Sequence, residues 1–120
     1  MIGVNGRRAM GGLKVGFFLT DLLEPNMGSL MVVPGSRRIQ GRPPSMPQAR
    51  YPIGAVELKL KAGDAVIFQH GVFHAGASNL SDQTRIALYY GYSYRVMRPI
   101  DYDKMPVEFL QKCTPIGRQL

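Results

Sequence analysis

The sequence has little cysteine and no long apolar run, and each shortage excludes a class of protein. Cys113 is the single cysteine among 120 residues, so the chain cannot form an internal disulfide. Its apolar stretches are interrupted by Gly, Pro or charge, and none approaches the roughly 20 residues that a membrane-spanning helix needs. The opening residues, MIGVNGRRAMGGLK, lack the continuous apolar segment of a signal peptide. We therefore expect a cytoplasmic protein with no membrane partner.

Acidic residues are also scarce, because 15 Lys and Arg stand against 8 Asp and Glu for a net charge of +7. Such an excess is typical of proteins with anionic partners. No helix-turn-helix or finger spacing is present, and the arginines are not interleaved with the aromatic residues of a single-strand binder. The arginines in Gly/Pro-rich segments are Arg7, Arg8, Arg37, Arg38, Arg42 and Arg50. We expect no nucleic-acid partner, and interpret the charge as a solvated surface or as a preference for a small anionic substrate.

The residues that are present indicate one globular domain over residues 1–120, with 45% apolar and 19% charged residues. Five segments combine strand-favouring residues with turn signals at their ends: 13–20 (LKVGFFLT), 29–33 (SLMVV), 56–60 (VELKL), 65–69 (AVIFQ) and 85–94 (RIALYYGYSY). Residues 105–112 place Pro and Glu early and Lys late, which suits a short helix. Short strands with short connections predict a mainly β protein, an antiparallel sandwich or barrel.

Residues 35–52 (GSRRIQGRPPSMPQARYP) differ from the rest of the chain. They carry four prolines and four arginines, which predicts a long surface loop without regular structure. Long loops in small β proteins often lie over a binding site, and a disordered excursion is the alternative.

Both histidines, His70 and His74, lie four residues apart in FQHGVFHAGASN. In a helix they would share one face, as in zinc proteases. Gly71, Gly76 and Ser78 are poor helix residues, and the Glu that such enzymes use is missing. We therefore expect an extended chain bent at Gly71, in which one His can be a ligand without the other. The residues alone leave open whether either is a ligand or a hydrogen-bonded core group.

A longer sequence pattern around the histidines helps to decide whether either of them is a ligand. GDAVIFQHGVFHAGASNLSDQTRIALYY has a Gly-Asp turn, a strand, a His, an Asn-x-Ser loop and an Arg that opens a new strand, and EPNMGSLMVVPGSR precedes it. Together they resemble the C-terminal half of the phytanoyl-CoA dioxygenase family, over about Leu13 to Tyr94. That family comprises non-haem Fe(II) and 2-oxoglutarate dependent oxygenases on a double-stranded β-helix. The resemblance implies a cupin-like jelly roll, here incomplete, and the hydroxylation of a small organic substrate.

The resemblance assigns two site residues. The family's distal iron ligand falls on His74, and the Arg that holds the far carboxylate of 2-oxoglutarate falls on Arg85. Neutral imidazole suits Fe(II), and a guanidinium can bind a carboxylate in bidentate fashion. Strand alternation places Arg85 on one face with Ala87 and Tyr89, directed inward. The alternative for Arg85 is a surface ion pair with Asp82.

The family's iron site also needs a second His and a carboxylate, which it takes from an HxD motif, and no His precedes His70 in this sequence. We favour the explanation that the chain is a fragment of an ordinary dioxygenase, or a reading frame opened at an internal Met, and inactive alone. The alternatives are a non-catalytic, cupin-like module that binds a small carboxylate, and a site completed by another chain. His70 has no ligand role in the resemblance and is expected in or behind the pocket wall.

Other acidic residues are poor replacements for the missing carboxylate. Asp21 and Glu24 flank a turn, and Asp64 belongs to a Gly-Asp turn at the wrong end of its strand, so we expect all three to be structural. An incomplete barrel also leaves strand edges without partners, from which we expect homo-oligomers.

Overall fold

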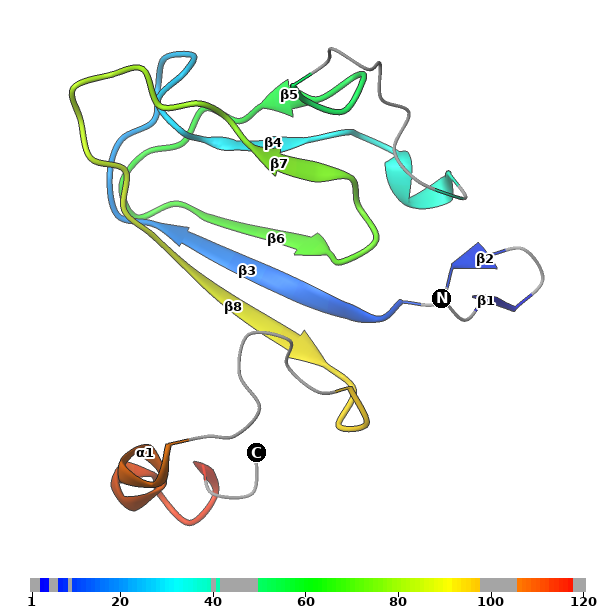
Figure 1. Ribbon diagram of the computed structural model, residues 1–120, viewed down its shortest axis with the longest axis vertical. Coiled ribbons are helices and arrows are strands. Elements are labelled where there is room, and N and C mark those ends of the chain that lie inside the picture. The colour runs from blue at the N-terminus through cyan, green and yellow to red at the C-terminus, as the bar shows by residue number, and fades with distance from the viewer. Residues whose placement is uncertain are drawn as a thin grey trace.

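Two three-stranded antiparallel sheets form the body of the molecule (Figure 1). The computed structural model describes residues 3–4, 7–8, 10–39, 41, 50–97 and 106–117. The elements in chain order are β1 (Gly3–Val4), β2 (Arg7–Arg8), β3 (Gly12–Phe18), β4 (Leu30–Val32), the 3-10 helix η1 (Ser36–Arg38), β5 (Val56–Glu57), β6 (Ala65–Gln69), β7 (His74–Gly76), β8 (Ala87–Ser93) and α1 (Val107–Lys112). The mainly β class and the short C-terminal helix are confirmed.

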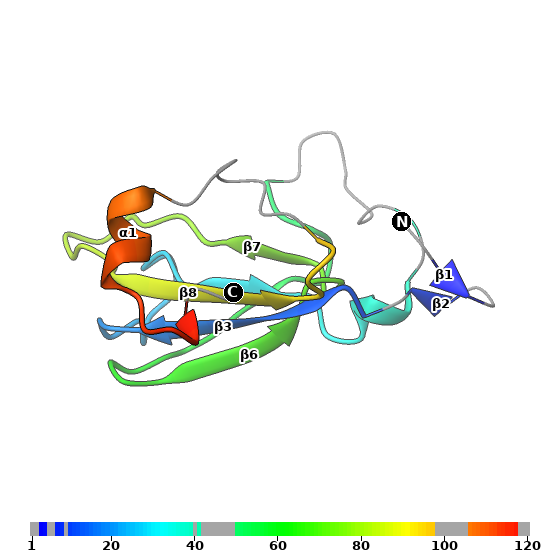
Figure 2. The ribbon, with the colours of Figure 1, turned by 90° about the horizontal axis from the view of Figure 1, so that it is seen from below.

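The two sheets have the strand orders β6-β3-β8 and β5-β4-β7, and every pairing is antiparallel. After β3 the chain crosses to the second sheet for β4 and β5, returns for β6, crosses again for β7 and returns for β8. This repeated crossing gives the incomplete jelly-roll fold that the sequence predicts. Strands β1 and β2 pair only with each other, on the opposite side of the molecule from α1 (Figures 1 and 2).

The hydrophobic core lies between the sheets. Phe18 from β3, Leu30 from β4 and Phe68 from β6 are buried there. At one end, Leu22 and Leu60 exchange backbone hydrogen bonds of 2.7 and 3.0 Å and bury both side chains. This bridge ties the connection after β3 to the connection before β6, and so holds the two sheets at a fixed separation.

Most strand bounds differ from the prediction. β6 has the predicted bounds, but β8 begins at Ala87 rather than Arg85, where the amide of Ile86 donates to the hydroxyl of Thr20 at 3.2 Å instead of to a neighbouring strand. Strand β7 was not predicted, since three residues that end in glycine carry no strand periodicity.

The Pro/Arg-rich segment 35–52 requires one correction. Ser36–Arg38 form a 3-10 helix, which Gly35 opens with a left-handed φ of 73°. Residues 40 and 42–49 of this segment lie outside the described residues. At its end, Tyr51 shares a 2.6 Å hydrogen bond with the hydroxyl of Ser78 and accepts one from the Ser78 amide. The hydroxyl contact with Ser78 lowers the pKa of Tyr51 and fastens this end of the segment to the loop after β7.

No helix among the described residues has the length and apolar character to cross a membrane.

The outer face of the β6-β3-β8 sheet carries apolar side chains that the described residues do not cover. Ile67 is 67% exposed and Tyr90 is 53% exposed, and the two flank Val15 in the strand register. Phe17, beside them, packs edge-on against Tyr90 at 6.0 Å between ring centroids. A contiguous apolar patch of this kind is typical of an interaction surface.

We expect this face and the edges of its sheet to cause self-association. Light scattering during gel filtration should give a molar mass above the 13.3 kDa of one chain, rising with concentration. The double variant Ile67→Thr/Tyr90→Thr keeps strand-compatible residues and should remain monomeric. Leu80→Thr, at an exposed loop position, is the matched control. A wild-type mass that stays at one chain throughout would contradict the expectation.

Candidate functional site

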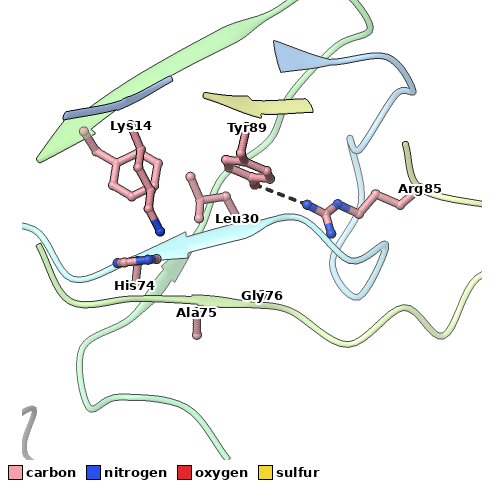
Figure 3. Close-up of a pocket in the computed structure, with 8 residues that line it drawn as sticks. Lys14, Leu30, His74, Ala75, Gly76, Arg85 and Tyr89 are labelled. Carbon is pink, nitrogen blue, oxygen red and sulfur yellow. Dashed lines mark hydrogen bonds between the residues drawn. The ribbon is translucent and has the colours of Figure 1, made fainter. Parts of the chain in front are cut away.

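A partly open cavity of about 270 Å³ lies between the two sheets (Figure 3). Side chains from both sheets and from the loop before β8 line it: Lys14, Leu30, Phe68, His74, Ala75, Gly76, Arg85 and Tyr89. Its volume is just below the roughly 300–1,000 Å³ of most small-molecule sites. The lining includes two cations and one imidazole but no carboxylate. Such a cavity suits a small anion.

His74 opens β7 and is held in the cavity by several contacts. It is paired with Val32 in the strand register, and its ring lies edge-on to Phe68 with 5.0 Å between centroids. Its Nδ1 is 2.8 Å from the carbonyl oxygen of Val72. A carbonyl oxygen only accepts, so Nδ1 carries the proton, and Nε2 of the neutral ring keeps its lone pair. This is the arrangement in which a histidine ligates a metal.

The residue before His74 is fixed by the PGS segment. Ser36 is fully buried, and its hydroxyl accepts a 2.8 Å hydrogen bond from the amide of Phe73. The backbone also pairs there, since the amide of Val33 donates to the carbonyl of Phe73 at 2.8 Å. The serine of this segment therefore positions the start of β7.

Arg85 enters the cavity from the loop just before β8, at the end opposite Lys14 and His74 (Figure 3). Its Nη2 donates to the hydroxyl of Tyr89 at 3.2 Å, and its guanidinium carbon lies 5.8 Å from the centroid of that ring. Its Nε is buried and has no hydrogen-bond partner. A buried donor of a charged group is costly unless an acceptor satisfies it, and an anion in the cavity would supply one.

Two glycines make room for this pair of residues. A Cβ on Gly28 would lie 3.2 Å from Cδ of Arg85, and Gly28 adopts a left-handed φ of 79°. A Cβ on Gly16 would lie 2.7 Å from Cε1 of Tyr89, its cross-strand partner. The glycine of the EPNMGSL segment and the glycine of β3 thus allow Arg85 and Tyr89 to approach the backbone closely.

The sequence matches a known protein family. The family model described as Phytanoyl-CoA dioxygenase (PhyH) matches residues 6–87. The chain belongs to this family. A search of curated proteins found no match. His74 and Arg85 both lie within the matched residues. PhyH proteins are oxygenases that use Fe(II) and 2-oxoglutarate, so the family supports oxygenase-type chemistry in general.

PhyH chemistry requires 2-oxoglutarate and iron, and the residues of this chain fit the first better than the second. Arg85, with its free donors, fits the carboxylate of 2-oxoglutarate. Iron fits less well: no cluster of three or more His, Cys, Asp or Glu side chains occurs in the described part of the chain. The whole sequence has two histidines, and only His74 lines the cavity. Among the described residues, His74 is therefore the one histidine at the cavity that could ligate iron.

The other histidine and two of the acidic residues considered as replacement ligands lie outside the cavity. His70 does not line the cavity, which leaves the second of its two expected positions, behind the wall; its ring packs against Gly12, where a Cβ would lie 3.0 Å from Cε1. Asp21 accepts the amide of Ala62 at 2.8 Å, and Asp64 accepts that of Lys61 at 2.7 Å. Both carboxylates are structural, as expected.

Glu24 was expected to be structural rather than a ligand, and Arg85 to point inward or to pair with Asp82. Glu24 is exposed and does not line the cavity. Arg85 donates to Tyr89 rather than pairing with Asp82, which is itself exposed. The inward direction that strand alternation predicts for Arg85 is therefore the observed one.

Sequence reasoning did not assign roles to Lys14 and Gly28. Lys14 alternates with Leu13 and Val15 in LKVGFFLT, which places it on the same face as Gly16 and therefore toward the second sheet. That alternation was the signal available in the sequence. The role of Gly28 depends on a contact with Arg85, 57 residues later, and no local pattern reveals it.

We expect Gly16→Ala to destabilise the protein, because the new methyl group would collide with the Tyr89 ring. The free energy of unfolding should fall by about 1–3 kcal/mol, the usual cost of overpacking. Gly91→Ala is the matched control on the neighbouring strand, since a Cβ there meets no atom within 4 Å. Urea unfolding followed by circular dichroism measures both. Equal stability of the two variants would show that Tyr89 does not need Gly16.

Proposed function

We propose that this chain carries the 2-oxoglutarate-binding part of an Fe(II)-dependent oxygenase, with Arg85 as the group that holds the cosubstrate. The observation that supports this most directly is the buried, unpaired Nε of Arg85 beside a cavity without an acidic residue. A carboxylate of 2-oxoglutarate would supply the missing acceptors in a charge-assisted, bidentate contact. Tyr89 would orient the guanidinium through its 3.2 Å hydrogen bond.

His74 is proposed as the one iron ligand that this chain contributes. Its Nδ1 contact with Val72 fixes the ring and leaves Nε2 available. Iron and 2-oxoglutarate together would supply the oxidising chemistry that attacks a C–H bond of a small organic substrate. The chain's own residues bind the cosubstrate, orient its carboxylate and shield the cavity from water between the sheets. Because a facial triad needs two further ligands, we infer that the chain is inactive alone.

We expect 2-oxoglutarate to bind this chain in the presence of EDTA, and Arg85→Met to weaken that binding. Hydrogen bonds to charged groups contribute about 1.5–3 kcal/mol, which corresponds to roughly 10- to 150-fold in the dissociation constant. Isothermal titration calorimetry measures it. Arg85→Lys keeps the positive charge but loses the planar guanidinium, so its dissociation constant should lie between those of the wild type and Arg85→Met.

The matched control is Arg38→Met, which removes the same charge from an exposed position. Arg38→Met should bind like the wild type. Thermal unfolding of each variant confirms that the fold is retained. Absence of 2-oxoglutarate binding to the wild type, or equal binding by wild type and Arg85→Met, would contradict the proposed function.

A second expectation concerns iron. Under anaerobic conditions with Fe(II) and 2-oxoglutarate, the chain alone should show no visible charge-transfer band, and in air it should form no succinate. A band that appears in the wild type and disappears in His74→Ala would mean that other groups complete the iron site. The inference that the chain is inactive alone would then be wrong, whereas the assignment of His74 as a ligand would be supported.

A further inference from the structure

Lys14 is unusual among the residues that face the inside of the β6-β3-β8 sheet. It shares the inner face of β3 with Gly12, Gly16 and Phe18, which are all buried, yet it ends in an ammonium group. Lysine is rarely placed on a half-buried strand face unless its charge is paired. Lys14 lines the cavity, and no described residue forms an ion pair or a hydrogen bond with its ammonium group.

The strand register sets the neighbours of this side chain. Lys14 lies opposite Gly91 on β8 and Phe68 on β6, and Phe68 supplies an apolar wall of the cavity. In Figure 3 Lys14 lies at the same end of the cavity as His74, whereas the guanidinium of Arg85 enters from the other end. The cavity therefore has one cation at each end.

Two separated cations in one small cavity match a ligand with two separated negative charges. A single carboxylate held by Arg85 would leave the ammonium of Lys14 uncompensated, and none of the lining residues is acidic. An ammonium at the His74 end of the cavity also disfavours a bare metal ion there, because like charges repel. A carboxylate at that end of the cavity would offset both costs.

We propose that Lys14 binds the second carboxylate of the ligand whose first carboxylate is held by Arg85, so that this chain recognises a dicarboxylate without metal. The inference rests on the proposed function and names the ligand class of that site. Arg85 and Lys14 then act as a pair, and the distance between the two carboxylates of the ligand, rather than iron chelation, selects 2-oxoglutarate over monocarboxylates.

The test compares two ligands by calorimetry in EDTA: 2-oxoglutarate, and 2-oxopentanoate, which has the same carbon chain but one carboxylate. The wild type should prefer 2-oxoglutarate by about tenfold or more, the usual worth of one charge-assisted contact. Lys14→Met should weaken 2-oxoglutarate binding by about tenfold and reduce this preference. Lys14→Gln, which retains polarity without charge, should behave like Lys14→Met.

Lys59→Met is the matched control, since Lys59 is exposed and its loss changes the net charge equally. Loss of 2-oxoglutarate binding in Arg85→Met with full binding in both Lys14 variants would overturn the role of Lys14 and leave the proposed function intact. If the wild type binds neither ligand, the proposed function fails and the role of Lys14 fails with it.

Discussion

The antiparallel pairing of β3 with β8 is the constraint on which the candidate site depends. Its register places Tyr89 over Gly16 and Lys14 on the same inner face, so one ladder directs both the hydrogen-bond partner of Arg85 and the second cation toward the cavity. A shift of one residue would turn these side chains to the outer face, where apolar residues now lie. Because β3 is hydrogen-bonded on both edges, it cannot slip without breaking two ladders. The chemistry of the cavity is thus fixed by backbone pairing before any ligand is present.

The charges that this pairing directs into the cavity are all positive. The cavity gathers Arg85 and Lys14 without an acidic residue to neutralise them, and the Nε of Arg85 has no acceptor. In a folded protein a desolvated donor without an acceptor costs free energy. A site of this kind is expected where a ligand supplies the missing anions. The residues available for a metal are fewer: among the described residues, His74 is the one histidine that lines the cavity, and no cluster of three or more His, Cys, Asp or Glu side chains occurs there.

The fold class could be predicted from the sequence because strand and turn signals are local. The segment Ala65–Gln69 is bounded by a Gly-Asp turn and a glycine, and its bounds are the predicted ones. Strand β7 could not be predicted, because its three residues are held by β4 and by the buried hydroxyl of Ser36, both distant in the sequence. The positions of His74 and Arg85 were accessible through family resemblance, whereas their roles are still proposals. The close approach of Arg85 to Gly28 is a contact between distant segments, and local sequence propensities could not predict it.

The central claim is that a dicarboxylate binds between the two sheets at Arg85. It is tested most directly by recording amide ¹H–¹⁵N spectra of the chain during titration with 2-oxoglutarate in EDTA. The structure predicts saturable shifts confined to residues that line or support the cavity, above all Gly76, Arg85 and Tyr89. Exposed basic positions such as Arg38 and Arg50 should remain unchanged. Shifts that are absent, or that spread over the basic surface and vanish with added salt, would contradict it.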